Sequence, residues 1–214
     1  MFSSLLGEVM LRHHQRIARS VDVAVSGLAL LVFAPVIAVI ALVVRLRLGS
    51  PVLFRQDRVG RDELVFRLVK FRTMRVPDAD HITDADRLTR VGRWLRATSL
   101  DELPTLWNVF RGEMSLVGPR PLLVEYLPLY SPVQARRHEV RPGITGLAQI
   151  SGRNALTWEE KFAYDVDYVD NRTHLMDLRI LGRTISAVVT RRGAVEVCHG
   201  PFRGSTEPGH ERAD

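Results

Sequence analysis

Two adjacent carboxylates are the residues of this chain best suited to covalent chemistry. Asp101 and Glu102 lie in the run 99–104, which reads Ser-Leu-Asp-Glu-Leu-Pro. If Asp101 is the N-cap of a helix, Pro104 is its third residue, where no intrahelical donor is needed. Both carboxylates then lie at the positive end of the helix dipole, which keeps Asp ionised and binds phosphate. This arrangement suits an Asp nucleophile that attacks a phosphoryl group, with Glu102 beside a divalent cation.

The same run also has a purely structural interpretation. Ser99 and Glu102 have the spacing of a capping box, in which each side chain satisfies a backbone N–H of the other residue. In that register Pro104 falls past the first turn and forfeits a hydrogen bond. The residues alone leave both registers open, and we expect a helix over residues 99–110 that ends near Gly112.

Basic residues at three other places are candidates for binding a phosphate. The stretch 70–74 (Lys-Phe-Arg-Thr-Met) follows a predicted strand, and residues 118–121 hold Arg120 between two prolines. The prolines reduce the entropy that Arg120 loses when it grips an anion. Residues 141–147 are rich in glycine, but they lack the Gly-Lys-Ser/Thr ending of a P-loop and form no dinucleotide fingerprint. A strand margin or a rigid surface turn is the structural alternative in each case.

A long apolar segment precedes all of these motifs. Residues 23–44 contain no charge over 22 positions, which exceeds the roughly 18 residues that suggest a membrane helix. Arginines flank both ends, and basic flanks favour the cytoplasmic side. Pro35 lies near the middle and promotes a bend. We therefore predict a re-entrant helix–bend–helix that enters one leaflet and returns, with a single bitopic span as the alternative.

The rest of the chain predicts a small, mostly helical α+β domain on the membrane surface. Residues 51–54 and 64–71 are rich in Val, Leu and Phe and predict a short β-hairpin. Residues 76–86 predict a mobile loop. The predicted helices are residues 86–96, 99–110, 157–169 (which starts with a capping box) and 179–190. We assign residues 1–48 to the N-terminal segment and membrane helix, 49–192 to the catalytic domain and 193–214 to a disordered tail.

Composition narrows the class of protein. The 214 residues are 46% hydrophobic and 25% charged, with a net charge of +6, which is ordinary for a globular chain. A single cysteine excludes an internal disulfide framework and a multi-cysteine zinc site. Of the 30 basic residues 28 are Arg, the better bidentate phosphate ligand, although a GC-rich genome explains the same bias. No nucleic-acid-binding motif accompanies the basic stretch 87–96, so we expect no nucleic acid partner.

Several motifs in a fixed order resemble one known family. They are the apolar segment with its central Pro, Lys-Phe-Arg-Thr-Met (70–74), Ser-Leu-Asp-Glu-Leu-Pro (99–104), Leu-Val-Gly-Pro-Arg-Pro (116–121), Arg-Pro-Gly-Ile-Thr-Gly (141–146), Ser-Gly-Arg (151–153), and the later stretches 164–169 and 175–178. From about Arg16 to Thr190 the chain resembles the bacterial sugar transferases. These are monotopic phosphoglycosyl transferases that act on polyprenol phosphate, here similar to the short catalytic form.

The resemblance implies a reaction and a set of site residues. Asp101 would attack the sugar-linked phosphate of a UDP-sugar, UMP would leave, and polyprenyl (undecaprenyl) phosphate would then take the phospho-sugar. Glu102 would help to bind Mg²⁺, and Arg120 would hold a phosphate. Weaker phosphate-binding candidates are Arg96 and Lys70, and the residues expected to border the uridine or the sugar are Gly143, Gly146 and Arg153. The family's helix-breaking Pro matches Pro35, although Ala34 stands where many members have Ser.

The resemblance also implies partners and a location. The expected partners are a UDP-sugar, polyprenyl phosphate, the lipid bilayer and a second copy of the chain as a homodimer. The expected location is the bacterial inner membrane, with the catalytic domain on the cytoplasmic face. An N-acetylated or bacillosamine-type sugar and a plain hexose such as glucose or galactose both remain open as donors. The alternative class is a bitopic membrane scaffold whose basic domain binds a partner and catalyses nothing.

Overall fold

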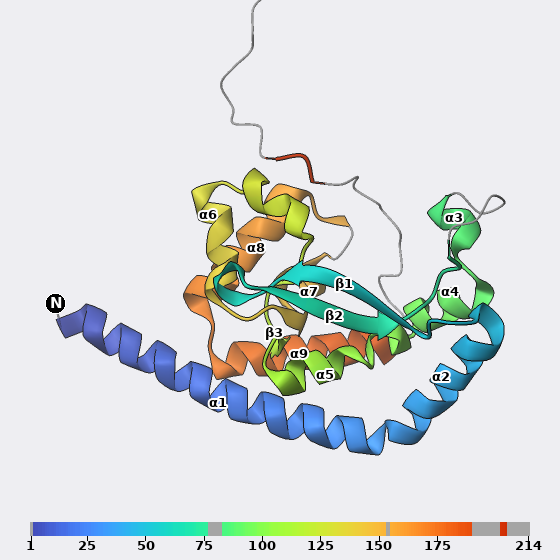
Figure 1. The fold of residues 1–214 in the computed structure, drawn as a ribbon. Helices are drawn as coiled ribbons and strands as arrows, with labels where there is room; N and C mark the ends of the chain where they lie inside the picture. Colours follow the sequence, from blue (N-terminus) through green and yellow to red (C-terminus); the bar gives the residue numbers. More distant parts are fainter. Residues whose placement is uncertain (1, 77–82, 153–154, 190–201, 205–214) are drawn as a thin grey trace, which may run out of the picture.

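Two long helices joined at a bend support one side of a small domain (Figure 1). A computed structural model describes residues 2–76, 83–152, 155–189 and 202–204. Helix α1 covers Phe2–Val32 and α2 covers Ala34–Leu48. In Figure 1, α1 runs along the lower edge of the domain and α2 rises at one end of it, towards α4 (Arg90–Ala97).

The break between the two helices lies where the sequence predicts it. Phe33 separates them, and Pro35 stands in the first turn of α2, where its missing N–H costs no hydrogen bond. The axes of residues 16–32 and of α2 differ by 62°. No single helix among the described residues is long and apolar enough to cross a bilayer, whereas this bent pair passes the same criteria when its limbs are taken together. The bend at Pro35 is confirmed, and membrane entry stays a prediction.

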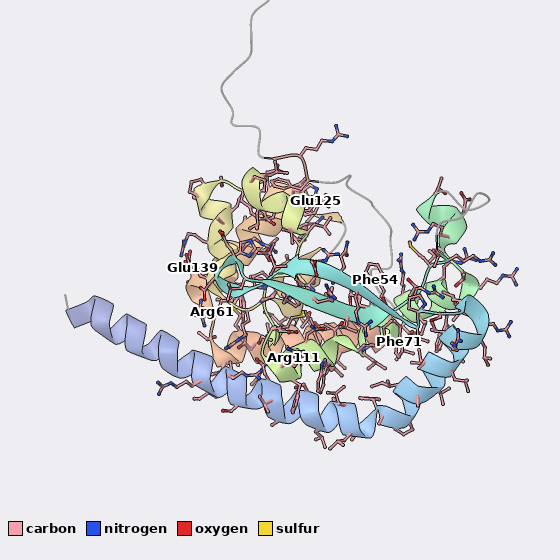
Figure 2. All side chains as sticks on the ribbon, in the orientation of Figure 1. Phe54, Arg61, Phe71, Arg111, Glu125 and Glu139 are labelled. Atoms are coloured by element: carbon pink, nitrogen blue, oxygen red, sulfur yellow. The ribbon has the colours of Figure 1, made fainter. Side chains whose placement is uncertain are left out.

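The bent pair is apolar outside and is tied to the domain inside. Ile40 and Val44 of α2 are buried against Phe71 and Leu95, and Phe71 lies where the hairpin approaches α2 (Figure 2). Large apolar side chains on the outer side are exposed: Leu28, Leu31, Val32, Phe33, Val39, Leu42 and Leu46.

Two arginines connect α1 and α2 to the rest of the domain through hydrogen bonds. Arg19 of α1 donates to the carbonyls of Val109 (2.6 Å) and Phe110 (2.8 Å). Arg72 donates to the three successive carbonyls of residues 48–50, just where α2 ends. The last carbonyls of a helix lack partners in a following turn, so they can accept hydrogen bonds from side chains. The Val109 carbonyl also accepts the N–H of Gly112.

The predicted hairpin is confirmed, with a longer first strand. Strands β1 (Leu53–Val59) and β2 (Val65–Phe71) are antiparallel, in register from Leu53 opposite Phe71 to Val59 opposite Val65. Their connection contains the 3₁₀ turn η1 (Arg61–Glu63). The inward-facing Phe66 and Leu68 are buried and join the main core.

A second, parallel pair of strands was missed by the sequence analysis. β3 (Ser115–Val117) pairs with β4 (Gly143–Thr145). The two segments approach so closely that a Cβ on Gly143 would lie 2.1 Å from the backbone nitrogen of Gly118. A side chain at this position would require the backbone to move.

The remaining elements are short, apart from the last two helices. They are α3 (Asp84–Arg87), α4 (Arg90–Ala97), η2 (Leu100–Glu102), α5 (Thr105–Arg111), η3 (Val124–Leu129), α6 (Pro132–Ala135), η4 (Arg136–Glu139), α7 (Leu147–Ser151), α8 (Trp158–Asn171) and α9 (His174–Val189). The capping box at Thr157 is confirmed. The helix predicted over 86–96 is instead two helices, because Leu88 forms a β-bridge with Met74 and Thr89 caps α4. The last helix begins five residues before its predicted start.

The predicted disordered tail contains a buried residue. Phe202 is only 4% exposed and packs with Tyr126 and Phe162. An aromatic ring in contact with other rings removes a large apolar surface from water, so this part of the tail prediction is wrong. Residues 193–201 and 205–214 lie outside the described residues, as do residues 77–82 of the predicted loop.

Candidate active site

The two carboxylates lie in a 3₁₀ turn before α5, so neither predicted helix register is right. Ser99 has a left-handed backbone (φ 56°) and makes no capping hydrogen bond, which rules out the capping box. Pro104 has no N–H to donate to the carbonyl of Leu100, and α5 begins only at Thr105. The C-cap at Gly112 (φ 86°) is confirmed. Asp101 and Glu102 therefore belong to a tight turn between α4 and α5.

Side chains of α5 fix this turn against the hairpin. Thr105 Oγ1 donates to the Val69 carbonyl at 2.9 Å, and the N–H of Val69 donates to Asn108 Oδ1 at 3.1 Å. Asn108 Nδ2 also donates to the carbonyl of Arg67 at 2.8 Å. A helix here occupies the hydrogen-bonding positions of a third strand along the free edge of β2. Sequence reasoning missed both residues, since a Thr and an Asn on a helix carry no signal of such a role.

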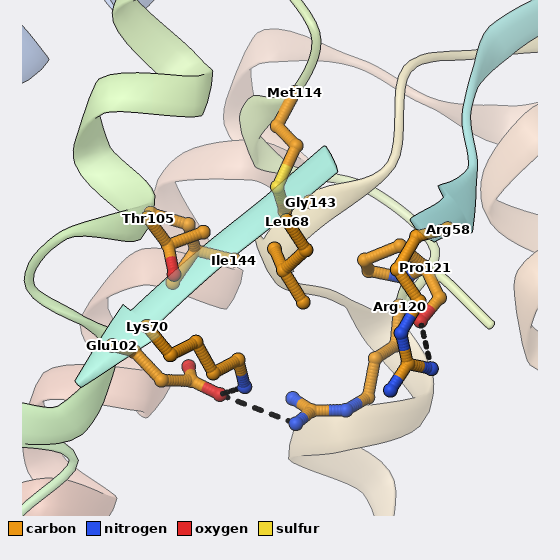
Figure 3. A pocket seen from close by; sticks show the side chains of 10 residues that line it. All are labelled: Arg58, Leu68, Lys70, Glu102, Thr105, Met114, Arg120, Pro121, Gly143 and Ile144. Atoms are coloured by element: carbon orange, nitrogen blue, oxygen red, sulfur yellow. Dashed lines mark hydrogen bonds and ion pairs between the residues drawn. The ribbon is translucent and has the colours of Figure 1, made fainter. Parts of the chain in front are cut away.

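This docking brings Glu102 onto Lys70 and Arg120. Lys70 Nζ lies 2.5 Å from Glu102 Oε1, and Arg120 Nη2 lies 3.2 Å from the same oxygen (Figure 3). The side chains of Lys70 and Glu102 are only about one-fifth exposed, while that of Arg120 is half exposed. Three of the predicted site residues, from three segments of the chain, therefore form one cluster.

The surroundings displace the two carboxylate pKa values in opposite directions. Burial and the neighbouring Glu102 raise the pKa of Asp101 to about 6, against the opposing effect of Lys70, Arg96 and Arg120. Burial alone would also raise the pKa of Glu102, but Arg120 and Lys70 outweigh it and lower that pKa to about 2. Two adjacent acids whose pKa values are pushed apart are a common mark of an acid–base or nucleophilic site.

Arg96 lies near Asp101 but not in the ion cluster. Its Nε donates to Thr73 Oγ1 at 3.0 Å, and its charge contributes to holding the Asp101 pKa down. The predicted role of Arg96 as a phosphate ligand stays a prediction.

A cleft of about 300 Å³, its open mouth included, lies beside the cluster (Figure 3). Its lining residues are Arg58, Leu68, Lys70, Glu102, Thr105, Met114, Arg120, Pro121, Gly143 and Ile144. Three of these side chains are cationic and one is anionic, so the cleft suits a polyanion. Arg58, which lies in β1, was not among the residues that the sequence analysis singled out.

The glycines expected to border a ligand have a backbone role as well. Gly143 lines the cleft. A Cβ on Gly146 would lie 2.2 Å from the carbonyl oxygen of Gly118, so a close approach of two chain segments already requires glycine there. Arg153 lies outside the described residues.

A divalent cation has a sparse but suitable set of ligands here. No group of three or more His, Cys, Asp or Glu side chains is placed for metal binding in the part of the chain that the structure describes. Mg²⁺, however, is commonly held by one or two carboxylates together with substrate phosphates. Lys70 and Arg120 both contact Oε1 of Glu102, and Asp101 accepts no hydrogen bond from any described residue. The Oε2 oxygen of Glu102 therefore fits such a cation.

Comparison with known proteins identifies the family. The family model described as bacterial sugar transferase matches residues 13–191, which is most of the chain. The chain belongs to this family. This sugar transferase is 54% identical over 160 residues to a Bacillus subtilis protein named uncharacterized sugar transferase EpsL, with 73% of this chain and 79% of the relative covered.

Two further relatives carry names that describe a reaction. A Caulobacter vibrioides protein named UDP-glucose:undecaprenyl-phosphate glucose-1-phosphate transferase is 41% identical over 189 residues, covering 82% of this chain and 71% of its own. An Erwinia amylovora protein named UDP-galactose-lipid carrier transferase is 37% identical over 204 residues, covering 86% of this sugar transferase and 43% of its own length.

Proposed function

We propose that this sugar transferase moves a sugar-1-phosphate from a UDP-sugar to polyprenyl phosphate through a covalent intermediate on Asp101. The names of the relatives support the overall reaction and its two substrates. The observation that carries the covalent step is the environment of Asp101. It is a buried carboxylate whose pKa of about 6 leaves it mostly ionised at pH 7, beside a cluster of cations that suits a diphosphate.

The first half-reaction uses Asp101 as the nucleophile. One of its carboxylate oxygens attacks the phosphorus that carries the sugar, and the bond from this phosphorus to the bridging oxygen of UMP breaks. UMP leaves with that bond's electron pair, and the phospho-sugar remains on Asp101 as an acyl phosphate. Lys70 and Arg120 stabilise the negative charge that the diphosphate brings into the cleft.

The second half-reaction regenerates the enzyme. A phosphate oxygen of polyprenyl phosphate attacks the same phosphorus, and the acyl-phosphate bond to Asp101 breaks. The product is a polyprenyl-diphosphate sugar, and Asp101 is again a free carboxylate. Two successive displacements at one phosphorus make a ping-pong scheme.

Glu102 would help to hold Mg²⁺ in this proposal. When bound, the cation would neutralise phosphate charge and ease the approach of an anionic nucleophile. Glu102 is suited to this task, since its low pKa keeps it ionised over the whole physiological range.

We further propose that the bent pair of helices is a re-entrant anchor in the bacterial inner membrane. The exposed apolar side chains around Phe33 support this, because soluble surfaces rarely expose such a continuous apolar area. An anchor of this kind would hold the cleft at the cytoplasmic surface, where a soluble UDP-sugar and a lipid phosphate can meet. A homodimer stays a prediction.

The decisive experiment separates the two half-reactions. Purified protein in detergent is mixed with Mg²⁺ and a UDP-sugar, first without acceptor and then with a short polyprenyl phosphate. The panel starts with UDP-glucose and UDP-galactose and continues with N-acetylated donors. We expect a burst of about one UMP per enzyme without acceptor, continuous turnover with it, and neither in Asp101→Asn.

Other outcomes would point elsewhere. Turnover with acceptor but no burst without it would exclude the covalent step and keep the overall transfer. Equal turnover in Asp101→Asn would remove Asp101 from the chemistry. If no donor yields UMP, a scaffold that binds a partner becomes the better account of the chain.

A further inference from the structure

Three successive carbonyls hold the loop that carries Arg120. Residues 118–121 contain two prolines, which have no N–H. Most of the backbone groups that can form hydrogen bonds here are therefore carbonyls. The Pro119 carbonyl accepts the N–H of Gly143 at 2.9 Å. Arg58 Nη1 donates to the Pro121 carbonyl at 3.2 Å. The carbonyl between them, that of Arg120 itself, accepts Nη2 of Arg137 at 2.7 Å.

Arg137 is itself fixed by a buried carboxylate. Its Nε and Nη2 lie 3.0 and 2.8 Å from Asp165 Oδ2, and both side chains are less than a tenth exposed. The guanidinium also lies over the rings of Tyr130 and Phe162, at 5.9 and 5.7 Å from their centroids. A guanidinium enclosed in this way has little freedom to leave the Arg120 carbonyl.

A contribution to stability does not by itself explain why Arg137 and Asp165 form an ion pair in the interior. Replacing a buried ion pair by apolar residues of similar shape is often neutral or stabilising, because both charges must be taken out of water. Arg137 Nη2, however, donates both to Asp165 and to the carbonyl of Arg120, whose side chain contacts Glu102. The buried pair therefore connects α8 and η4 to the ion cluster through one backbone atom.

We propose that Arg137 and Asp165 are positioning residues, which aim the Arg120 side chain into the cleft by holding its carbonyl. The proposal deepens the proposed function and rests on it, because Arg120 binds phosphate only if the cleft receives a UDP-sugar. Displacing a binding group by about 1 Å can lower a rate by 10²-fold, so a loss of this restraint has a measurable effect.

The chain offers a matched control one residue away. Arg136 and Asp170 join the same two elements, η4 and α8, with Nη2 2.5 Å from Oδ1. This pair is nearly half exposed, and the contacts of Arg136 go to Asp170 and Glu139, not to the loop of Arg120. Removing it tests whether any ion pair between η4 and α8 has the same effect.

The test is a double-mutant cycle on the burst of UMP release without acceptor. The double replacement Arg137→Met with Asp165→Leu removes both charges and keeps shape, so the domain stays folded, which thermal unfolding verifies. We expect the burst rate to fall by about tenfold to a hundredfold. In an Arg120→Ala background the same double replacement is expected to change the rate by less than about twofold, because the side chain that the pair positions is absent. Arg136→Gln with Asp170→Asn leaves the rate unchanged.

Two kinetic results would overturn the proposal. One is an unchanged burst rate in the Arg137→Met, Asp165→Leu protein. The other is an equal loss with and without Arg120, which would make the pair a general support of the domain.

Hydrogen exchange of the peptide around residues 118–124 adds a readout that needs no substrate. It is expected to speed up at least about tenfold in the Arg137→Met, Asp165→Leu protein and to stay unchanged in the control. Unchanged exchange overturns the proposal whatever the enzyme transfers. Faster exchange in a protein whose wild type releases no UMP would support the restraint on the loop and count against the proposed function.

Discussion

Lys70 Nζ lies 2.5 Å from Glu102 Oε1, and this contact helps to separate the pKa values of the adjacent carboxylates Asp101 and Glu102. Glu102, which Arg120 also contacts, has a pKa of about 2, whereas Asp101 has a pKa of about 6. Glu102 thus stays ionised over the physiological range and engaged with cations, whereas Asp101 accepts no hydrogen bond from the described residues and has a pKa close to neutrality. The proposed reaction needs two different carboxylates: Asp101 as the nucleophile, and Glu102 as an anion that holds Lys70 and Arg120 in place.

The pH dependence of UMP release tests this division. In the proposed reaction only ionised Asp101 attacks phosphorus, so the burst rate without acceptor should rise from pH 5 and level off above about pH 7, with a midpoint near 6. Each phosphate of a UDP-sugar carries one ester and one anhydride bond and has no second proton to lose near pH 6, so the donor does not mask the effect. Rapid-quench measurement between pH 5 and 8 is the assay, and a flat profile would contradict the assignment.

Asp101→Asn should produce an inactive protein that is more stable than the wild type at neutral pH. The folded-state pKa of Asp101 lies above its ordinary value of 3.8, so this group favours folding at low pH and loses that contribution as pH rises through about 6. Removing the charge is expected to raise stability at pH 7.5 by up to about 3 kcal/mol. Denaturant unfolding at pH 7.5 and below pH 4 checks this, and the gain should nearly vanish at the lower pH.

Asn108 should be the most sensitive residue of α5. Its side chain is buried and serves backbone groups at Val69 and Arg67. Asn108→Ala leaves these groups without partners and is expected to cost about 2–4 kcal/mol of unfolding free energy. Thr105→Val, which removes one hydrogen bond and keeps the shape, should cost about 1 kcal/mol. Equal effects of the two changes in denaturant titrations would mean that the edge of β2 is not held as described.

The elements that sequence predicts well are those set by local pattern. The apolar run with Pro35, the hairpin and the capping box at Thr157 each depend on residues within one short stretch. β3 and β4 have three residues each and lie far apart in the chain, so neither carries a usable periodicity. The cluster of Lys70, Glu102 and Arg120 was predicted as separate motifs, whereas Arg58, Asn108 and Arg137 depend on tertiary contacts that no local pattern records.

Phe202 should matter although it lies in the segment predicted to be disordered. Its ring centroid lies 4.9–5.8 Å from those of four other aromatic residues, Tyr126, Tyr130, Trp158 and Phe162. Phe202→Ala is expected to lower the free energy of unfolding by about 3 kcal/mol, as for other buried phenylalanines. Arg203→Ala, at an exposed neighbour, is the control and should change it by less than about 0.5 kcal/mol. A Phe202→Ala protein as stable as the wild type would show that the ring is not held there in solution.

Two glycine substitutions should have opposite signs. Gly143→Ala places a Cβ 2.1 Å from the nitrogen of Gly118 and should destabilise the protein by more than about 2 kcal/mol. Gly182 lies in the middle of α9 with open space around its Cβ position, so Gly182→Ala should stabilise by about 0.5–1 kcal/mol. Thermal unfolding of both variants against wild type is the measurement. A neutral Gly143→Ala would argue that the two chain segments are not in contact.

The closed edge of the hairpin has a consequence for association between molecules. An unpaired strand edge is a template on which a second chain can add a strand. Along β2 the N–H and the carbonyl of Val69 and the carbonyl of Arg67 are already taken by Thr105 and Asn108. The packing of α5 against β2, which places Glu102 next to Lys70, therefore also blocks pairing of this edge with another chain. Loss of Asn108 should therefore promote aggregation along with loss of activity.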